Sequence, residues 1–248
     1  MDKAKIQEIL VTLYMRLNGY FTSGFIVHSP KKGRNLTEVD ILAVRFPGNR
    51  EPERQVHPAP ELDPCTTATD IVIGEVKSKG GLLQFNQALT TSHESLASIL
   101  RWVGVLDDEE IQQVAAELVR KLTGGGLEPA RIEGPRATRV QALLFSPGRC
   151  SRQTGEPWYI SGEQIFGFIF RCLSPAIARP GCSAVYDFGL WGYGQHAPHC
   201  PCRLCCTQCA LASSWPPRCS AVVPPLRRPN GPKPIPRSNP PTAGRSKN

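Results

Sequence analysis

Residues 70–78 read DIVIGEVKS, a mostly apolar and β-branched run that contains a glutamate and a lysine. Such a run, followed by the breaker Gly80-Gly81, predicts a β-strand. Glu75 and Lys77 are two positions apart, so on a strand their side chains leave the same face of the sheet, about 7 Å apart. Charged groups on a buried strand are costly unless they are paired or bind an ion. This strand is therefore the first candidate for a functional site.

A second apolar strand with one acidic residue is predicted upstream. Residues 37–46 read TEVDILAVRF and end before Pro47. Asp40 is followed directly by Ile41, Leu42, Ala43 and Val44. We therefore expect its carboxylate to lie near the core, where it needs a hydrogen-bond partner or a cation.

The rest of the pattern predicts helices around these strands. Apolar residues at helical spacing (Ile6, Leu10, Leu13 and Leu17) predict a helix over residues 4–18. Further elements are expected as helices at 82–106, 107–122 and 161–173, strands at 24–30 and 139–146, and a strand or extended segment at 184–191, with a proline-rich loop at 47–69. This order predicts an α/β fold with a mixed β-sheet flanked by helices.

The charge distribution divides the chain near residue 192. The net charge is +8, but residues 193–248 contain eight Lys or Arg, no Asp or Glu, and 12 of the 24 prolines. Residues 1–192 are therefore neutral overall, and the basic pI is no argument that they bind DNA. We expect one folded domain at 1–192 and an irregular Pro/Cys/Arg-rich tail at 193–248. A tail of this charge would bind nucleic acid non-specifically and with strong salt dependence.

Three interpretations of the tail remain open. Two C-x-x-C pairs, Cys202/Cys205 and Cys206/Cys209, lie near His196 and His199. This composition is typical of zinc ligands, but the pairs abut, whereas zinc modules separate them so that the chain can wrap around the ion. The alternatives to a zinc-binding element are a disordered extension and the product of a shifted reading frame.

Membrane insertion and secretion are not predicted. The sequence has no run of about 18 or more apolar residues, the length that a membrane span requires. The N-terminus, MDKAKIQEIL, has charges of both signs and no apolar signal region. We therefore expect a cytoplasmic protein.

Asp40, Glu75 and Lys77 form a set that suits phosphodiester hydrolysis. A hard cation such as Mg²⁺ takes oxygen ligands and keeps several waters, so one or two carboxylates hold it. The backbone carbonyl of Val76 lies between Glu75 and Lys77 and could complete the coordination. The metal would polarise a phosphoryl oxygen, and the lysine would orient the attacking water or neutralise developing charge.

The motif and the order of elements resemble the PD-(D/E)XK superfamily of restriction-endonuclease-like nucleases and Holliday-junction resolvases. The matching residues are VD at 39–40 and EVK at 75–77, with Val39 in place of the proline that names the motif. The resemblance covers residues 4–146 and extends more loosely to 192.

This resemblance implies a restriction-endonuclease-like fold and a nuclease that depends on Mg²⁺ or Mn²⁺, with DNA favoured over RNA as its substrate. It implies that Asp40, Glu75 and Val76 hold the metal and that Asp40, Glu75 and Lys77 are catalytic. Many members act as dimers, so a homodimer fits as well.

Other interpretations stay open beside the nuclease. The same three side chains could form a salt-bridged cluster in a non-catalytic module that binds nucleic acid or a partner. Some superfamily members carry a glutamate on the first helix near the metal, but the helical wheel places Glu8 opposite the apolar stripe and favours a solvated residue. The polar residues Gln84 and Gln87 could support the site or lie on a helix surface. His28 and His93 are isolated histidines with no predicted role.

Overall fold

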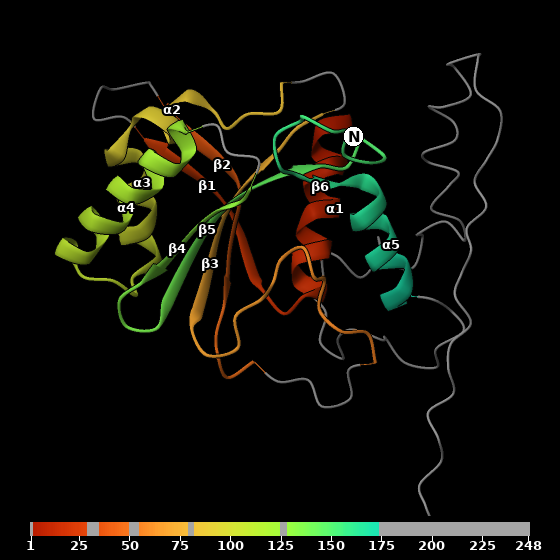
Figure 1. The fold of residues 1–248 in the computed structure, drawn as a ribbon, viewed down its shortest axis with the longest axis horizontal. Coiled ribbons are helices and arrows are strands. Elements are labelled where there is room, and N and C mark those ends of the chain that lie inside the picture. Colours follow the sequence, from red (N-terminus) through yellow and green to blue (C-terminus); the bar gives the residue numbers. More distant parts are fainter. Residues whose placement is uncertain (1, 29–34, 50–54, 79–81, 125–127, 174–248) are drawn as a thin grey trace, which may run out of the picture. The chain divides into compact units, whose positions relative to one another are not determined.

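The computed structural model describes residues 2–28, 35–49, 55–78, 82–124 and 128–173 (Figure 1). The elements follow one another as α1 (Lys3–Leu17), β1 (Phe21–His28), β2 (Asn35–Arg45), β3 (Thr69–Val76), α2 (Gln87–Thr91), α3 (His93–Val103), α4 (Asp108–Thr123), β4 (Ala130–Gly134), β5 (Thr138–Ser146), β6 (Ile160–Ser161) and α5 (Gly162–Leu173). The segment 184–191 and the tail 193–248, with its proposed zinc ligands, lie outside the described residues.

The strands form one mixed sheet in the order β1-β2-β3-β5-β4, and β6 pairs with β5. The pairs β1–β2, β2–β3 and β4–β5 are antiparallel, while β3–β5 and β5–β6 are parallel. A parallel pair needs a long crossover, which α2, α3 and α4 supply between β3 and β5. The predicted α/β class with a mixed sheet is thus confirmed.

Helices cover both faces of the sheet. In Figure 1, α2, α3 and α4 lie on one side of the strands and α1 and α5 on the other. On the α1 and α5 side, the ring of Tyr14 packs edge-on against Phe145 and Phe168, with centroids 6.4 and 5.3 Å apart. A second core lies under α3 and α4 and takes in Ile71 and Ile73 of β3.

The helix expected at 82–106 was wrong in its start and its continuity. The chain enters α2 only at Gln87 and breaks at Ser92 before α3 begins. Each start has its own N-cap: the Asn86 side chain accepts from the N–H of Leu89, and the Ser92 side chain accepts from that of Ser95. Gly104 then ends α3 in the left-handed region at φ 76°. The α4 boundary agrees closely with the prediction.

The buried face of α1 also differs from the predicted stripe. Ile6 is 40% exposed, whereas the buried residues of the helix are Gln7, Val11, Leu13, Tyr14, Met15 and Leu17. The inward face is therefore rotated relative to the stripe that starts at Ile6, which changes the expected position of Glu8.

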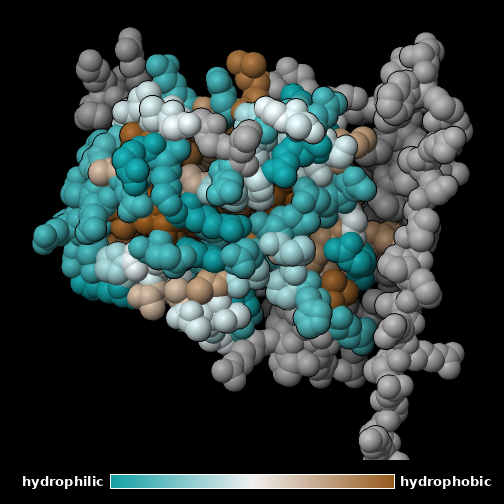
Figure 2. Space-filling view, viewed as in Figure 1, coloured by the Kyte–Doolittle hydropathy of each residue, from teal (hydrophilic) through white to brown (hydrophobic). Residues whose placement is uncertain are grey.

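The surface follows the amphipathic pattern of the helices. Figure 2 shows mostly hydrophilic side chains over α3 and α4, as expected for helices that bury one face only. Within the described ranges, no helix is both long and apolar enough to cross a membrane.

Candidate active site

Asp40 and Glu75 lie at the same end of the ladder between β2 and β3, although β2 itself begins at Asn35. In the β2–β3 register, Ile41 pairs with Gly74 and Leu42 with Ile73. Asp40 and Glu75 are the next residues on each strand, just beyond the last paired positions. Gly74 permits the close approach here, because a Cβ at this position would lie 2.8 Å from the Phe145 ring and 3.1 Å from Ile41 Cβ.

An irregularity in β2 sets the position of Asp40. Ser23 of β1 pairs with Leu42 and Phe25 pairs with Val39, so Asp40 and Ile41 together oppose Gly24. Two residues opposite one is a β-bulge, a feature that redirects side chains. It accounts for Val39 and Leu42 sharing the core beneath α3 and α4, which strict alternation would forbid.

The Asp40 carboxylate reaches across to β3. Its Oδ2 accepts a hydrogen bond from the backbone N–H of Val76 at 2.8 Å. In an extended strand the N–H and C=O of one residue point to the same side, so the Val76 carbonyl also faces β2. The Asp40 side chain thus joins β2 and β3 where the backbone ladder between them stops.

Glu75 and Lys77 form an ion pair beside this contact. Glu75 is only 2% exposed, and its Oε2 contacts the Lys77 ammonium and accepts the backbone N–H of Asn86 at 3.1 Å. The Lys77 backbone is held by β5: its N–H donates to the Phe145 carbonyl at 2.7 Å, and its carbonyl accepts from Ser146 Oγ at 2.9 Å. Both charged side chains are therefore fixed at the strand end.

The electrostatics of the cluster favour a proton or a cation at Asp40. Burial raises the pKa of Asp40 most, and the nearby carboxylates of Glu75 and Glu8 raise it further. The Val76 N–H and the Lys77 charge lower it, but the net direction is upward. Two carboxylates thus act on the charge of a third in this region.

Glu8 is closer to this cluster than the helical wheel predicts. Its side chain is 29% exposed and forms an ion pair with Lys5 at 2.9 Å. The pKa of Lys5 is raised chiefly by this hydrogen bond and by the charge of Glu8, with smaller contributions from Glu38 and Asp40. The rotated inward face of α1 brings Glu8 toward β2. Gln7 and Tyr14 belong to this buried face, but the predicted apolar stripe did not include them.

Asn86 is the residue that sequence reasoning overlooked. Its backbone N–H binds Glu75, and its side-chain Nδ2 donates to Thr37 Oγ1 at 2.9 Å and to the Glu38 carbonyl at 3.2 Å. It therefore connects β2, β3 and α2 around the site. The available signal was an asparagine before a helical stretch, a preferred N-cap.

The other candidates lie apart from these contacts. Gln84 and Gln87 are exposed and line a neighbouring cavity. His93 Nε2 contacts the Gln112 carbonyl of α4 at 3.0 Å. The side chain of His28 lies outside the described part of the structure.

The donor set fits a hard cation that keeps its own waters. Among the described residues, no three His, Cys, Asp or Glu side chains gather as a ready-made metal centre. Mg²⁺ needs only one or two carboxylates, and the hydrogen bonds above use Oδ2 of Asp40 and Oε2 of Glu75, not the second oxygen of either group. Such an ion would neutralise the negative charges of Asp40 and Glu75, which lie close together.

Comparisons with known proteins find no match. No protein-family model matches the chain, and neither does any curated protein or solved structure. Any assignment of function to this site therefore depends on its residues and their geometry, together with the motif that they form.

Proposed function

We propose that this protein is a metal-dependent nuclease of the PD-(D/E)XK type that hydrolyses phosphodiester bonds in nucleic acid, DNA in preference to RNA. The observation that carries the proposal is the grouping of Asp40, Glu75 and Lys77 where the ladder between β2 and β3 ends, with the pKa of Asp40 raised by burial and by other carboxylates. Perturbed carboxylates beside a lysine are frequent at catalytic sites.

Each residue has a role in this proposal. Asp40, Glu75 and the Val76 carbonyl would hold Mg²⁺ or Mn²⁺, and such an ion polarises the phosphoryl group and stabilises the leaving oxygen. Lys77 would then exchange its contact with Glu75 for the attacking water or a phosphate oxygen. Asn86 keeps Glu75 in place through its backbone N–H.

The ion pair between Glu75 and Lys77 favours a second candidate, a non-catalytic module in which the cluster only stabilises the strand ends. In that case the parent protein would neither bind a divalent cation at this site nor cleave a substrate. The two candidates therefore differ in a direct measurement.

The test is cleavage by the purified full chain of single-stranded, double-stranded and branched DNA, with Mg²⁺, Mn²⁺ or EDTA. We expect cleavage with either metal and none in EDTA. Asp40→Asn should abolish it, whereas Asp108→Asn, at the exposed start of α4, should not. A folded parent that cleaves none of these substrates with either metal would contradict the proposal.

A further inference from the structure

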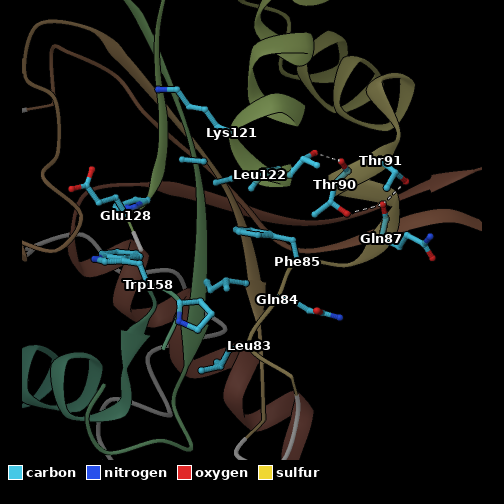
Figure 3. A pocket seen from close by; sticks show the side chains of 16 residues that line it. Leu83, Gln84, Phe85, Gln87, Thr90, Thr91, Lys121, Leu122, Glu128 and Trp158 are labelled. Atoms are coloured by element: carbon cyan, nitrogen blue, oxygen red, sulfur yellow. Dashed lines mark hydrogen bonds between the residues drawn. The ribbon is translucent and has the colours of Figure 1, made fainter. Parts of the chain in front are cut away.

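A cavity of about 570 Å³ opens beside the candidate active site. It lies between α2, the end of α4, β4, β5 and the segment that contains Trp158. In the view of Figure 3, Phe85 lies between Trp158 on one side and Thr90 on the other. Two half-buried aromatic side chains therefore contribute to its wall, together with the amide side chains of Gln84 and Gln87.

The cavity lies next to the site, although Asp40, Glu75 and Lys77 do not line it. Leu144, which lines it, is the register partner of Glu75 on β5. Asn86, whose N–H binds Glu75, is flanked in the chain by the lining residues Phe85 and Gln87. Lining residues of the cavity are therefore direct neighbours of Glu75 in the sheet and of Asn86 in the chain.

The charges of the cavity suit an uncharged ligand. Its lining contains one cation, Lys121, and one acid, Glu128, and the Lys121 ammonium already donates to the Arg131 carbonyl. A phosphate would gain little binding free energy in this cavity, because no free excess of positive charge lines it. A flat aromatic group with polar edges gains more, because it can stack on the rings and form hydrogen bonds with the amides.

We propose that this cavity binds an unpaired nucleobase that adjoins the phosphodiester to be cleaved. The inference rests on the proposed nuclease function and adds a substrate class: single-stranded nucleic acid, or a structure with an unpaired nucleotide at the cut. A base inside a duplex would first have to leave its stack, which costs free energy. Single strands are therefore bound and cut in preference to a continuous duplex.

The test is binding of labelled oligonucleotides to the full chain in EDTA, measured by fluorescence anisotropy. The parent should bind a single strand more tightly than the matching duplex. Trp158→Ala should weaken single-strand binding about tenfold or more, the typical effect of losing a stacking partner. Trp158→Phe, which keeps a ring, and Trp102→Ala, an exposed tryptophan of α3 outside the cavity, should remain close to the parent.

A probe on the ligand side makes the test independent of protein folding. A set of single-stranded oligonucleotides would each carry one abasic position, at a different place in each. The parent should lose affinity by a similar factor for at least one of them. The cavity proposal is overturned if no abasic position lowers the affinity, or if Trp158→Ala is folded and binds like the parent. Metal-dependent cleavage of DNA by the parent would still support the nuclease function in that case. If the parent neither binds nor cleaves any nucleic acid, both proposals fail.

Discussion

The backbone N–H of Val76 donates a hydrogen bond to Oδ2 of Asp40 at 2.8 Å. This bond crosses from β3 to the bulge in β2, at the point where the ladder between the two strands ends. A backbone donor does not depend on the side chain at position 76, so the position of the carboxylate is determined by the register of the strands. The charge of Asp40 is nevertheless unfavourable there, because burial outweighs the bond and raises its pKa.

Asp40→Asn should therefore stabilise the protein when no metal is present. Because the pKa of Asp40 is higher in the folded protein than its ordinary value of 3.8, the carboxylate lowers the free energy of unfolding above the folded pKa. The penalty is absent at pH values well below 3.8, where the carboxyl is protonated in both the folded and the unfolded state. We expect a higher melting temperature at neutral pH in EDTA, with a gain that shrinks as the pH falls.

A matched carboxylate on the surface gives the control for this measurement. Asp108→Asn should bring no gain at neutral pH, because Asp108 lies in the first turn of α4, where the helix dipole favours its charge. If Asp40→Asn instead lowers the melting temperature at neutral pH, Asp40 is a stabilising structural partner.

The catalytic role of Lys77 can be measured separately from metal binding. Lys77→Ala should leave Mg²⁺ affinity unchanged or higher, because it removes a positive charge that contacts Glu75 Oε2. Single-turnover cleavage should fall about 100-fold or more, the usual contribution of a positioned acid–base group. Lys77→Arg keeps the charge but not a proton that can be transferred, so its rate distinguishes charge neutralisation from proton transfer. Calorimetry that finds Mg²⁺ binding lost in Lys77→Ala would contradict this role.

Asn86 should act on the site through Glu75. Asn86→Ala keeps the backbone N–H that binds Glu75 but removes the helix cap and the side-chain bonds to Thr37 and Glu38 that position this N–H. We expect a loss of about 1 kcal/mol in stability and about tenfold in Mg²⁺ affinity. Ser92→Ala removes the comparable cap of α3, in which the Ser92 side chain accepts from the Ser95 N–H, and should lower stability without changing Mg²⁺ affinity. Equal Mg²⁺ affinities in the two variants would show that Asn86 is only a cap.

Much of the sheet could be predicted because its central strands have strong local patterns. The strands around Asp40 and Glu75 were found from continuous apolar runs, and α4 from its acidic start and basic end. β4 was missed because Ile132 is its only fully buried residue, and β6 because it is two residues long and exists only through pairing with β5. The break at Ser92 depends on a cap that competes with helix propensity.

The sequence predicts only those features of the site that lie within one β-strand. Asp40, Glu75 and Lys77 stood out as charges in apolar strands, which is a local signal. The β-bulge, in which Asp40 and Ile41 lie opposite Gly24, depends on the register between β1 and β2. This register cannot be predicted from the sequence of either strand alone. The contribution of Glu8 depends on the rotation of α1 against the sheet, where Gln7 is buried although its polarity excluded it from the predicted stripe.

The opposite end of β3 provides a test of the fold that is independent of function. Asp70 is fully buried and accepts hydrogen bonds from Tyr20 Oη at 2.6 Å, Arg139 Nη2 at 2.7 Å and Gln141 Nε2 at 2.9 Å. The Arg139 side chain is only 7% exposed, so the loss of its partner charge leaves a cation in a poorly solvated place. Removing one partner of a buried ion pair is far more costly than removing one from the surface.

Asp70→Asn should therefore lower the free energy of unfolding by about 3 kcal/mol or more, measured by urea denaturation. Arg136→Gln breaks two ion pairs of similar length, to Asp107 at 2.6 Å and Glu110 at 2.9 Å, but the Arg136 side chain is 58% exposed. Its loss should cost far less than the loss of Asp70, because solvent already screens those charges. Equal costs for the two variants would mean that solvent reaches the Asp70 network and that the start of β3 is less tightly packed than its burial indicates.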